Sequence, residues 1–491
     1  MGGQQLKREL GLLHATMMGI GGALCAGVFL TIGYAATLAG TALIIAMVLC
    51  GIINFFTMLS YAELGTAIPS AGGEYTFAKA AFGGFISFAT GWFEWISNMF
   101  YAAFCSVGFA YMLSYIFPSI NIPLIAVTTI AAFTAINIRG VKETGRTETF
   151  LVIVLLVLLC TFIAFGLSSD RGSGNLALSA PGGFLGILKA SAFIFVVYLG
   201  GEAIAVAQAE IKDPGRTIPR AIILSCLTLI FLYTIIAFVV FRTVSPESLA
   251  SQASPLAYVA SVLLGDVGLG IITLAGIIAA LTSINTSIMA QSRVAYALAR
   301  DGYFPKNFHN LHKRFSTPHA AILVGAVFVA ATAATGLVNF VAYATDFGFI
   351  IGFVFVNLSL IKLRQERRSL ARPFKVPLYP LTPILGIVTS LLLLFFLDIG
   401  TIVMGAELFL FGLLVYYIKM VGHSRLLIAM GGMNLGIAAF SALLVYLIAS
   451  GSLTVALPPV ITVTLFVVAL TVSVIYLVAG VLSVTARNQG D

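Results

Sequence analysis

Glycines interrupt the first long apolar stretch of the sequence. This stretch covers about residues 11–37 and contains Gly19, Gly21, Gly22 and Gly27. Such a glycine cluster predicts local unwinding of a helix, which frees N–H groups that can hold a carboxylate and carbonyls that can hold an ammonium or a cation. The same spacing is also typical of tight helix packing through small residues. From these glycines alone, both interpretations stay open.

A second glycine interruption lies in the stretch 184–209. Gly200 and Gly201 fall in the middle of this apolar run and are followed directly by Glu202. Paired broken helices at corresponding positions of two halves of a chain indicate a binding site at the membrane midplane. A carboxylate inside a membrane is costly and usually functional. We therefore expect Glu202 to accept hydrogen bonds from the freed N–H groups, with a proton relay as the alternative.

Two further acidic residues lie inside apolar stretches. Asp346 lies about six residues inside the outer end of the stretch 340–361. It could pair with a basic substrate, take a proton or form an outer gate, and an interfacial carboxylate at a helix end is the alternative. Glu94, in the stretch 84–117, raises the same question with less positional support. Both are candidates for gating or charge relay.

Cysteine and histidine patterns exclude several other kinds of site. All five cysteines fall inside apolar runs without CxxC spacing, so no disulfide framework or zinc site is predicted. The five histidines form no HExxH or comparable set, and His309, His312 and His319 share one basic loop where solvated histidines are common. We expect that the protein is not an enzyme, that it has no cofactor, and that it has no metal site beyond the candidate sodium site considered below.

The elements that position these residues follow from composition. Of the 491 residues, 60% are hydrophobic and 9% are charged, which excludes a water-soluble domain. The apolar runs are continuous and about 20 residues long, so they predict spanning helices and not a β-barrel. We expect an all-α polytopic membrane protein with about fourteen transmembrane helices. The expected spans are 11–37, 41–67, 84–117, 122–140, 148–168, 184–209, 221–243, 268–300, 319–337, 340–361, 380–398, 402–420, 426–449 and 456–485.

The placement of positive charge gives the orientation. With a cytoplasmic N-terminus, all of the 26 Lys and Arg except Arg171, Lys189 and Arg242 fall on the cytoplasmic side. This asymmetry follows the positive-inside rule and predicts that both termini are cytoplasmic in a multi-pass protein of the cell membrane. The net charge of +8 is therefore a topology signal, and the expected partner is the lipid bilayer, not nucleic acid. The basic run 362–375 could also touch anionic lipid.

Four motifs in order carry a family resemblance over about the first 375 residues. Taken together, they resemble the amino acid–polyamine–organocation (APC) superfamily of amino acid permeases. Fourteen spans, in place of the usual twelve, are similar to its cationic amino acid transporter branch. The motifs are Gly21–Phe29, the Glu-Leu-Gly and Pro-Ser-Ala-Gly-Gly-Glu-Tyr sequences within 61–75, the segment 210–220 with its Lys-Asp-Pro-Gly-Arg core, and the Ser-Arg…Ala-Arg-Asp-Gly segment 292–305.

The resemblance implies a five-plus-five inverted-repeat fold with discontinuous first and sixth spans. The transport core is then 1–375, with repeats at about 11–168 and 184–363, and 376–491 adds four C-terminal spans. The resemblance also implies alternating access around an amino acid held by the two breaks. The substrate carboxylate meets amides near Ala26 and Gly27, its ammonium meets carbonyls near Ala23 and in 195–199, and Tyr198 is an occluding aromatic. The implied substrate-binding residues are Ala23, Ala26, Gly27, Phe195, Tyr198, Leu199 and Gly200.

Two positions depart from the family pattern. Cys25 stands where the motif usually has glycine, which narrows the expected unwinding or thickens the pocket wall. Gly201 stands where the family often has an aromatic residue, and this enlarges the expected pocket. Tyr198 remains open to a second interpretation, simple helix packing.

Coupling to an ion can also be read from the resemblance. Some relatives place a lysine in the fifth span as a substitute for sodium, but the stretch 148–168 has none. The eighth span carries Thr282 and Ser283, whose hydroxyls match a sodium site in this fold, and oxygen ligands suit a hard cation. Bonding of both hydroxyls to their own helix is the alternative. The candidate Na+ ligands are Gly21, Leu24, Ala279, Thr282 and Ser283.

The expected function is secondary active transport of amino acids by alternating access. A neutral amino acid is the favoured substrate because few acidic groups lie near the breaks. Sodium is slightly favoured as the coupling ion over H+ or plain exchange. A proton-coupled or exchange permease for cationic amino acids or polyamines is the alternative, and a channel is the alternative from another class.

Overall fold

The computed structural model shows an all-helical chain. It describes residues 10–70, 72–139, 144–169, 176–208, 211–252, 254–312, 314–315, 317–420 and 459–485, with a few single residues between 434 and 445. Every regular element in these residues is a helix, and the one β contact printed among them is a bridge between Leu10 and Ile211. A helix satisfies its backbone polar groups within one segment, as lipid demands. The prediction of an all-α chain is confirmed.

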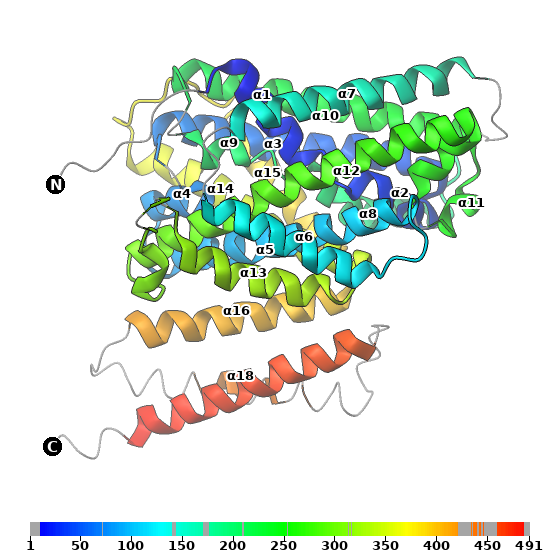
Figure 1. The fold of residues 1–491 in the computed structure, drawn as a ribbon. Helices are drawn as coiled ribbons and strands as arrows, with labels where there is room; N and C mark the ends of the chain where they lie inside the picture. Colours follow the sequence, from blue (N-terminus) through cyan, green and yellow to red (C-terminus); the bar gives the residue numbers. More distant parts are fainter. Residues whose placement is uncertain are drawn as a thin grey trace. The chain divides into compact units, whose positions relative to one another are not determined.

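The chain divides into two compact units. The larger contains Met1–Ala297 and Lys306–Leu397, and the smaller contains Leu298–Pro305 and Asp398–Asp491. Both glycine interruptions belong to the larger unit, which runs from blue to yellow in Figure 1.

The first half of the larger unit holds the first interruption. Its helices are α1 (Leu12–Ala23), α2 (Gly27–Ala39), the 3-10 turn η1 (Gly40–Ala42), α3 (Leu43–Ala67), α4 (Gly73–Ala81), α5 (Gly84–Ser114), α6 (Ile122–Arg139) and α7 (Thr144–Ser168).

The second half holds the second interruption. Its helices are α8 (Gly183–Ile194), the 3-10 turn η2 (Phe195–Tyr198), α9 (Ala203–Val206), α10 (Pro214–Thr243), α11 (Pro246–Ala250), α12 (Pro255–Arg300, of which the last residues belong to the smaller unit), η4 (Lys306–His309), α13 (His319–Ala333), α14 (Val338–Glu366) and α15 (Leu381–Phe395).

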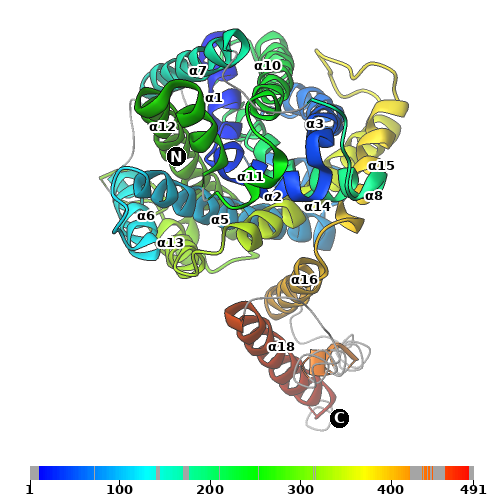
Figure 2. The ribbon, with the colours of Figure 1, turned by 90° about the vertical axis from the view of Figure 1, so that its right-hand side faces the viewer.

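The two interruptions lie among the helices α1, α3, α5, α10 and α14, which pack on one another. Helix α1 packs on α10 and α7, α3 packs on α10, α8 and α14, and α5 packs on α14, α4, α6 and α13. Figure 2 looks along most of these helices and shows α1, α3, α5, α10 and α14 grouped around α2. Small residues at the crossings allow close approach, as expected for helices that pack without a hydrophobic drive from water.

Eight helical segments in the described residues are long and apolar enough to cross a membrane. They are Gly27–Ala67, Gly84–Ser114, Ile122–Arg139, Glu148–Ser168, Gly183–Val206, Pro214–Thr243, Pro255–Arg300 and Val338–Glu366. Leu12–Ala23, His319–Ala333 and Phe466–Gly480 are shorter apolar helices. The molecule is therefore a multi-pass membrane protein. Most of the expected span 426–449 lies outside the described residues.

Helix α12 differs most from its expected bounds. It begins at Pro255, whereas the apolar pattern predicts a start at 268. Gly265, with φ 60° and ψ −143°, lies inside it and bends the chain. Because glycine adopts positive φ without steric cost, the bend joins a short apolar helix to the long one where the sequence suggests a loop.

The smaller unit contains α16 (Ile399–Met420) and α18 (Pro459–Thr485). Ala438, Val472 and Tyr476 form a buried cluster between its helices. The Tyr476 hydroxyl donates a hydrogen bond to the carbonyl of Leu410.

Candidate functional site

The first interruption is a short, well-defined break. Helix α1 ends at Ala23 and α2 begins at Gly27, so three residues, 24–26, lie outside both helices. The N–H of Gly27, at the start of α2, donates to the sulfur of Cys25 at 3.1 Å. The sulfur of Cys25 therefore satisfies a backbone donor at the start of α2.

The second interruption is longer. The 3-10 turn η2 ends at Tyr198, Leu199 is extended (φ −76°, ψ 152°), and Gly200 has φ +112° before α9 begins at Ala203. Both carboxylate oxygens of Glu202 accept from the N–H of Gly200, at 2.9 and 2.8 Å. This is the contact expected for Glu202, and it satisfies a backbone donor that the break sets free.

The two breaks meet through their backbones. A Cβ built on Gly200 would overlap the carbonyl of Gly22, and a Cβ on Gly22 would lie 2.5 Å from the carbonyl oxygen of Gly200. No side chain fits between the two segments. Unwinding and close packing, the two interpretations that the glycine spacing leaves open, therefore occur together at this point.

Two buried tyrosines bridge the breaks. The Tyr101 hydroxyl, from α5, lies 2.8 Å from the carbonyl oxygen of Gly22 and 3.2 Å from that of Leu199. The Tyr233 hydroxyl, from α10, lies 3.0 Å from the carbonyl oxygen of Ala23 and 2.9 Å from that of Val197. Each hydroxyl thus donates to carbonyls freed at both breaks. Sequence reasoning missed both residues, although a tyrosine inside a span must find a partner for its hydroxyl.

The side chain of Tyr198 is held by neighbouring helices. Its hydroxyl donates to the carbonyl of Met47 on α3 at 2.7 Å, and its ring lies edge-on to Tyr233 with centroids 5.1 Å apart. Tyr198 is fully buried. The structure thus places this side chain at the junction of η2, α3 and α10.

Several backbone groups expected to bind a substrate have partners inside the chain. The N–H of Gly27 is bonded to Cys25, and its carbonyl accepts from Thr31 at 2.9 Å. The carbonyls of Ala23 and Leu199 face the tyrosine hydroxyls. The carbonyl of Ala23 also accepts from the N–H of Cys25 at 2.8 Å, so both of its lone pairs are used, whereas that of Leu199 keeps one for a further donor.

The expected sodium ligands are only partly assembled. The Ser283 hydroxyl lies 3.3 Å from the carbonyl oxygens of both Gly21 and Gly22, so it reaches from α12 to α1. The Thr282 hydroxyl bonds within its own helix, to the carbonyl of Ala279 at 2.9 Å. Thr282 thus bonds to its own helix, as the alternative interpretation expects, while Ser283 contacts the first break.

Glu148 brings a carboxylate to this place and was not singled out by the sequence. It lies on α7, and its Oε1 accepts from the Thr286 hydroxyl at 3.4 Å. The same oxygen lies 3.9 Å from the position of a Cβ built on Gly21. The side chain of Val152, one helical turn after Glu148, lies against Gly21 and would overlap that Cβ. The sequence holds a signal for it, because Glu148 is an acidic residue at the start of the apolar stretch 148–168.

Glu94 anchors α4. Its Oε2 accepts from the N–H of Tyr75 at 3.0 Å, and a Cβ on Gly73 would overlap its Oε1. A carboxylate at the N-terminus of a helix is stabilised by the free N–H groups and the helix dipole. Glu94 therefore joins α5 to the start of α4.

Asp346 is fully buried on α14, and neither of its oxygens has a hydrogen-bond partner among the described residues. Three residues further along the same side of the helix, Phe349 contacts the ring of Tyr101, with centroids 6.4 Å apart.

The fold and the two joined breaks define a class of protein. Interrupted helices that meet inside a multi-pass helical protein are the arrangement of a membrane transporter's binding site. A family model described as "Amino acid permease" matches residues 10–420 of the chain. The chain belongs to this amino acid permease family, within the APC superfamily.

Individual relatives match most of the chain. The branched-chain amino acid permease BcaP of Bacillus subtilis is 28% identical over 447 residues, 87% of this chain and 96% of the relative. The methylthioribose transporter of Bacillus subtilis is 27% identical over 444 residues, 86% of this chain and 95% of the relative. An uncharacterised protein of Methanocaldococcus jannaschii is 32% identical over 370 residues, 73% of this chain and 83% of the relative. The family consists of transporters, and the chain is not an enzyme.

Proposed function

We propose that the chain is a secondary active transporter that carries neutral amino acids across the cell membrane by alternating access, coupled to a cation and preferentially to sodium. The observation that carries this proposal is the contact between the two breaks at Gly22 and Gly200, bridged by Tyr101 and Tyr233. Freed backbone groups at such a junction are suited to an amino acid, whose two charged ends need donors on one side and acceptors on the other.

A neutral substrate is favoured by a relative and by the shape of the second break. The BcaP relative is described as a permease for branched-chain amino acids. Gly201 has no side chain beside the break, and a Cβ there would be in ordinary contact with Met58 at 3.5 Å. We place the apolar side chain of the substrate on this side of the break, where Met58 is an uncharged neighbour.

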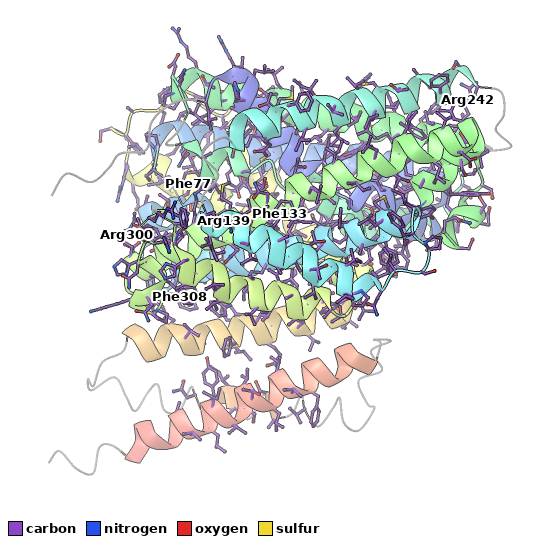
Figure 3. The ribbon with its side chains drawn as sticks, viewed as in Figure 1. Phe77, Phe133, Arg139, Arg242, Arg300 and Phe308 are labelled. Atoms are coloured by element: carbon purple, nitrogen blue, oxygen red, sulfur yellow. The ribbon has the colours of Figure 1, made fainter. Side chains whose placement is uncertain are left out.

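We further propose a ten-span core of two inverted repeats, about 11–168 and 184–363, followed by four spans, for a total of fourteen. The breaks support the repeat, because each lies in the first apolar stretch of its half. Cytoplasmic termini are supported by the separation of charge. Figure 3 shows Arg242, one of the three basic residues expected outside, at the opposite end of the larger unit from Arg139.

Sodium is proposed as the coupling ion, held by Ser283, Thr282 and the carbonyls of Gly21, Leu24 and Ala279. The contact of Ser283 with the carbonyl of Gly21 supports this site. Glu148 supports this site further, because a negative carboxylate attracts a nearby cation and so strengthens its binding. Proton coupling or exchange, with cationic amino acids or polyamines as substrates, is the second candidate, and buried Asp346 favours it.

The test is uptake of radiolabelled leucine into liposomes that contain the purified protein, with competition by each of the twenty amino acids. We expect saturable uptake and counterflow, inhibition by branched-chain amino acids, and loss of accumulation when choline replaces sodium. Absence of counterflow would indicate a channel, and inhibition by lysine or arginine alone would indicate the second candidate.

Variants separate the coupling ion from the substrate. Thr282→Ala combined with Ser283→Ala, and separately Glu148→Gln, should raise the half-saturating sodium concentration several-fold. Thr161→Ala is the matched control, because this exposed hydroxyl on α7 also bonds its own helix, at Val157. Accumulation that persists unchanged in choline would refute sodium coupling and leave the amino acid substrate unaffected.

A further inference from the structure

Asp346 is a buried carboxylate without a partner. It is fully buried, and both of its oxygens lack a hydrogen bond within the described part of the chain. No described basic side chain pairs with it. A carboxylate in this condition is among the most costly arrangements in a protein interior, and more so in a membrane. A buried carboxyl group avoids this cost by holding a proton or by binding a group that offers donors or positive charge.

The side of α14 that carries Asp346 covers the second break. Residues three positions before, and three and seven positions after, Asp346 lie on the same side of a helix. All three are aromatic and contact rings on α8, α5 and η2. The contacts, with centroid distances, are Tyr343 with Phe193 (4.9 Å), Phe349 with Tyr101 (6.4 Å) and Phe353 with Phe195 (5.9 Å).

One tyrosine links this side of α14 to both breaks. Tyr101, whose ring contacts Phe349, lies with its hydroxyl 2.8 Å from the carbonyl oxygen of Gly22 and 3.2 Å from that of Leu199. The side of α14 that carries Asp346 therefore faces the residues that join the two segments at Gly22 and Gly200.

The acceptors at the breaks limit where an ammonium can bind. An ammonium has three donors and needs several acceptors. The carbonyls of Gly22, Ala23, Val197 and Leu199 all face tyrosine hydroxyls. The two oxygens of Asp346 are acceptors at this place that no described residue uses.

We propose that Asp346 binds an ammonium group of the transported amino acid, so that a side-chain carboxylate on α14 takes the role otherwise left to backbone carbonyls. The proposal rests on the proposed amino acid transport. The ammonium comes from the α-amino group of a neutral amino acid or from the side chain of a basic one. A neutral substrate then cancels the charge of Asp346 only while it is bound, which makes the filled site less costly than the empty one.

The experiment measures how much an ammonium contributes to binding with and without the carboxylate. Ligand-dependent thermal stabilisation of the purified protein gives dissociation constants for leucine and for 2-hydroxy-4-methylpentanoate, which replaces the α-ammonium by a hydroxyl. A second pair, lysine and norleucine, tests the side-chain ammonium. Because the readout is binding, a variant that no longer transports still gives a result.

In the unaltered protein we expect leucine to bind about tenfold to a hundredfold more tightly than its hydroxy analogue, as a charge-assisted hydrogen bond implies. Asp346→Asn, which keeps the shape and removes the charge, should weaken leucine by about that factor and leave the analogue nearly unchanged. Asp346→Glu should retain part of the preference. Glu407→Gln is the matched control and should keep the full preference, because Glu407, in the smaller unit, is another buried carboxylate without a hydrogen-bond partner among the residues that the structure describes.

The outcomes are distinct. A preference for leucine over the hydroxy analogue that is lost in Asp346→Asn supports the α-ammonium, and a preference for lysine over norleucine that is lost instead supports the side-chain ammonium. If Asp346→Asn keeps both affinity ratios, that of leucine to its hydroxy analogue and that of lysine to norleucine, the proposal is overturned. If the unaltered protein binds no amino acid, the proposed function itself fails. If Asp346→Asn does not fold, Asp346→Glu provides the test. The proposal is overturned if this variant binds leucine as tightly as the unaltered protein and keeps both affinity ratios, leucine to its hydroxy analogue and lysine to norleucine.

Discussion

Glycine at positions 22 and 200 is required by the approach of two backbones. A Cβ on Gly200 would overlap the carbonyl of Gly22, and its φ of +112° is unfavourable for any residue with a side chain. We expect Gly200→Ala to lower the melting temperature by several degrees and to abolish uptake. Gly201→Ala is a neighbouring control, since its Cβ would meet only Met58 at an ordinary 3.5 Å. Equal effects of the two substitutions on melting temperature would contradict this account.

Tyr101 and Tyr233 each bridge the two breaks through a single hydroxyl group. The carbonyls of Gly22 and Ala23 keep a second donor, from Ser283 and from the N–H of Cys25. Removing the Tyr101 hydroxyl therefore takes the donor from Leu199, and removing the Tyr233 hydroxyl takes it from Val197, which costs about 1–3 kcal/mol each. Tyr101→Phe and Tyr233→Phe should each lower stability by about this amount, measured by thermal unfolding in detergent. Tyr111→Phe, on the same helix as Tyr101, is the control, because no hydrogen bond of the Tyr111 hydroxyl occurs within the described residues. If its effect matches that of Tyr101→Phe, the bridging role is wrong.

The sequence predicted the residues that lie in the breaks better than those that reach them. Glu202, Gly22 and Gly200 could be found because glycine pairs and a charge stand out in an apolar run. Tyr101 and Tyr233 could not, because an aromatic residue in a span is common and its partners lie on helices far away in the chain. Glu148 could not be assigned from the sequence, because an acidic residue at the end of an apolar stretch is also typical of a helix end in the interface.

At the scale of elements, a buried ion cluster joins the end of α3 to the segment after α14. Glu63 is fully buried and pairs with Arg364 and, at 3.3 Å, with Arg372. Its Oε2 also accepts from the N–H of Val376 at 2.7 Å. The guanidinium of Arg364 lies 4.1 Å from the ring centroid of Tyr379. One carboxylate thus fixes the chain that leads from α14 to α15.

Glu63→Ala should destabilise the protein by about 3–5 kcal/mol, because two largely buried arginines lose their partner. Glu366→Ala is the control at the same end of α14. Glu366 pairs with Lys362, one helical turn before it, on the exposed surface of α14. Loss of this pair should cost less than about 0.5 kcal/mol of stability. Thermal unfolding in the absence of substrate measures both. A loss for Glu63→Ala no larger than the control would show that the cluster does not hold this segment.

Element bounds were predictable wherever hydrophobicity alone decides them. Helices α3, α5 and α7 lie close to the expected 41–67, 84–117 and 148–168 because lipid leaves a long apolar run no alternative to a helix. The start of α12 was not predictable, because Gly265 and the polar residue beside it resemble a loop. Whether glycine ends a helix or bends it depends on the packing around it.

For the whole molecule, the distribution of charge predicts a direction across the membrane. Lys212 and Glu247 lie just beyond opposite ends of the 30-residue helix α10, and both side chains are exposed. The positive-inside rule places Lys212 in the cytoplasm and Glu247 outside. Cysteines introduced at these positions should therefore react differently with a membrane-impermeant maleimide. Of the native cysteines, four are buried and Cys160 is exposed, so Cys160→Ser provides the background.

In intact cells we expect Glu247→Cys to be labelled and Lys212→Cys to be protected, and in inside-out vesicles the reverse. Because one continuous helix joins the two positions, the pair reports orientation independently of how many spans precede it. The basic run 362–375 lies at the Lys212 end of α10, where Pro373 would contact a Cβ on Gly215. The reversed pattern would therefore place this run and the ion cluster around Glu63 outside, against the charge asymmetry. Labelling of both cysteines from one side would mean that α10 does not cross the membrane, and the paired-break site could not then lie at the midplane.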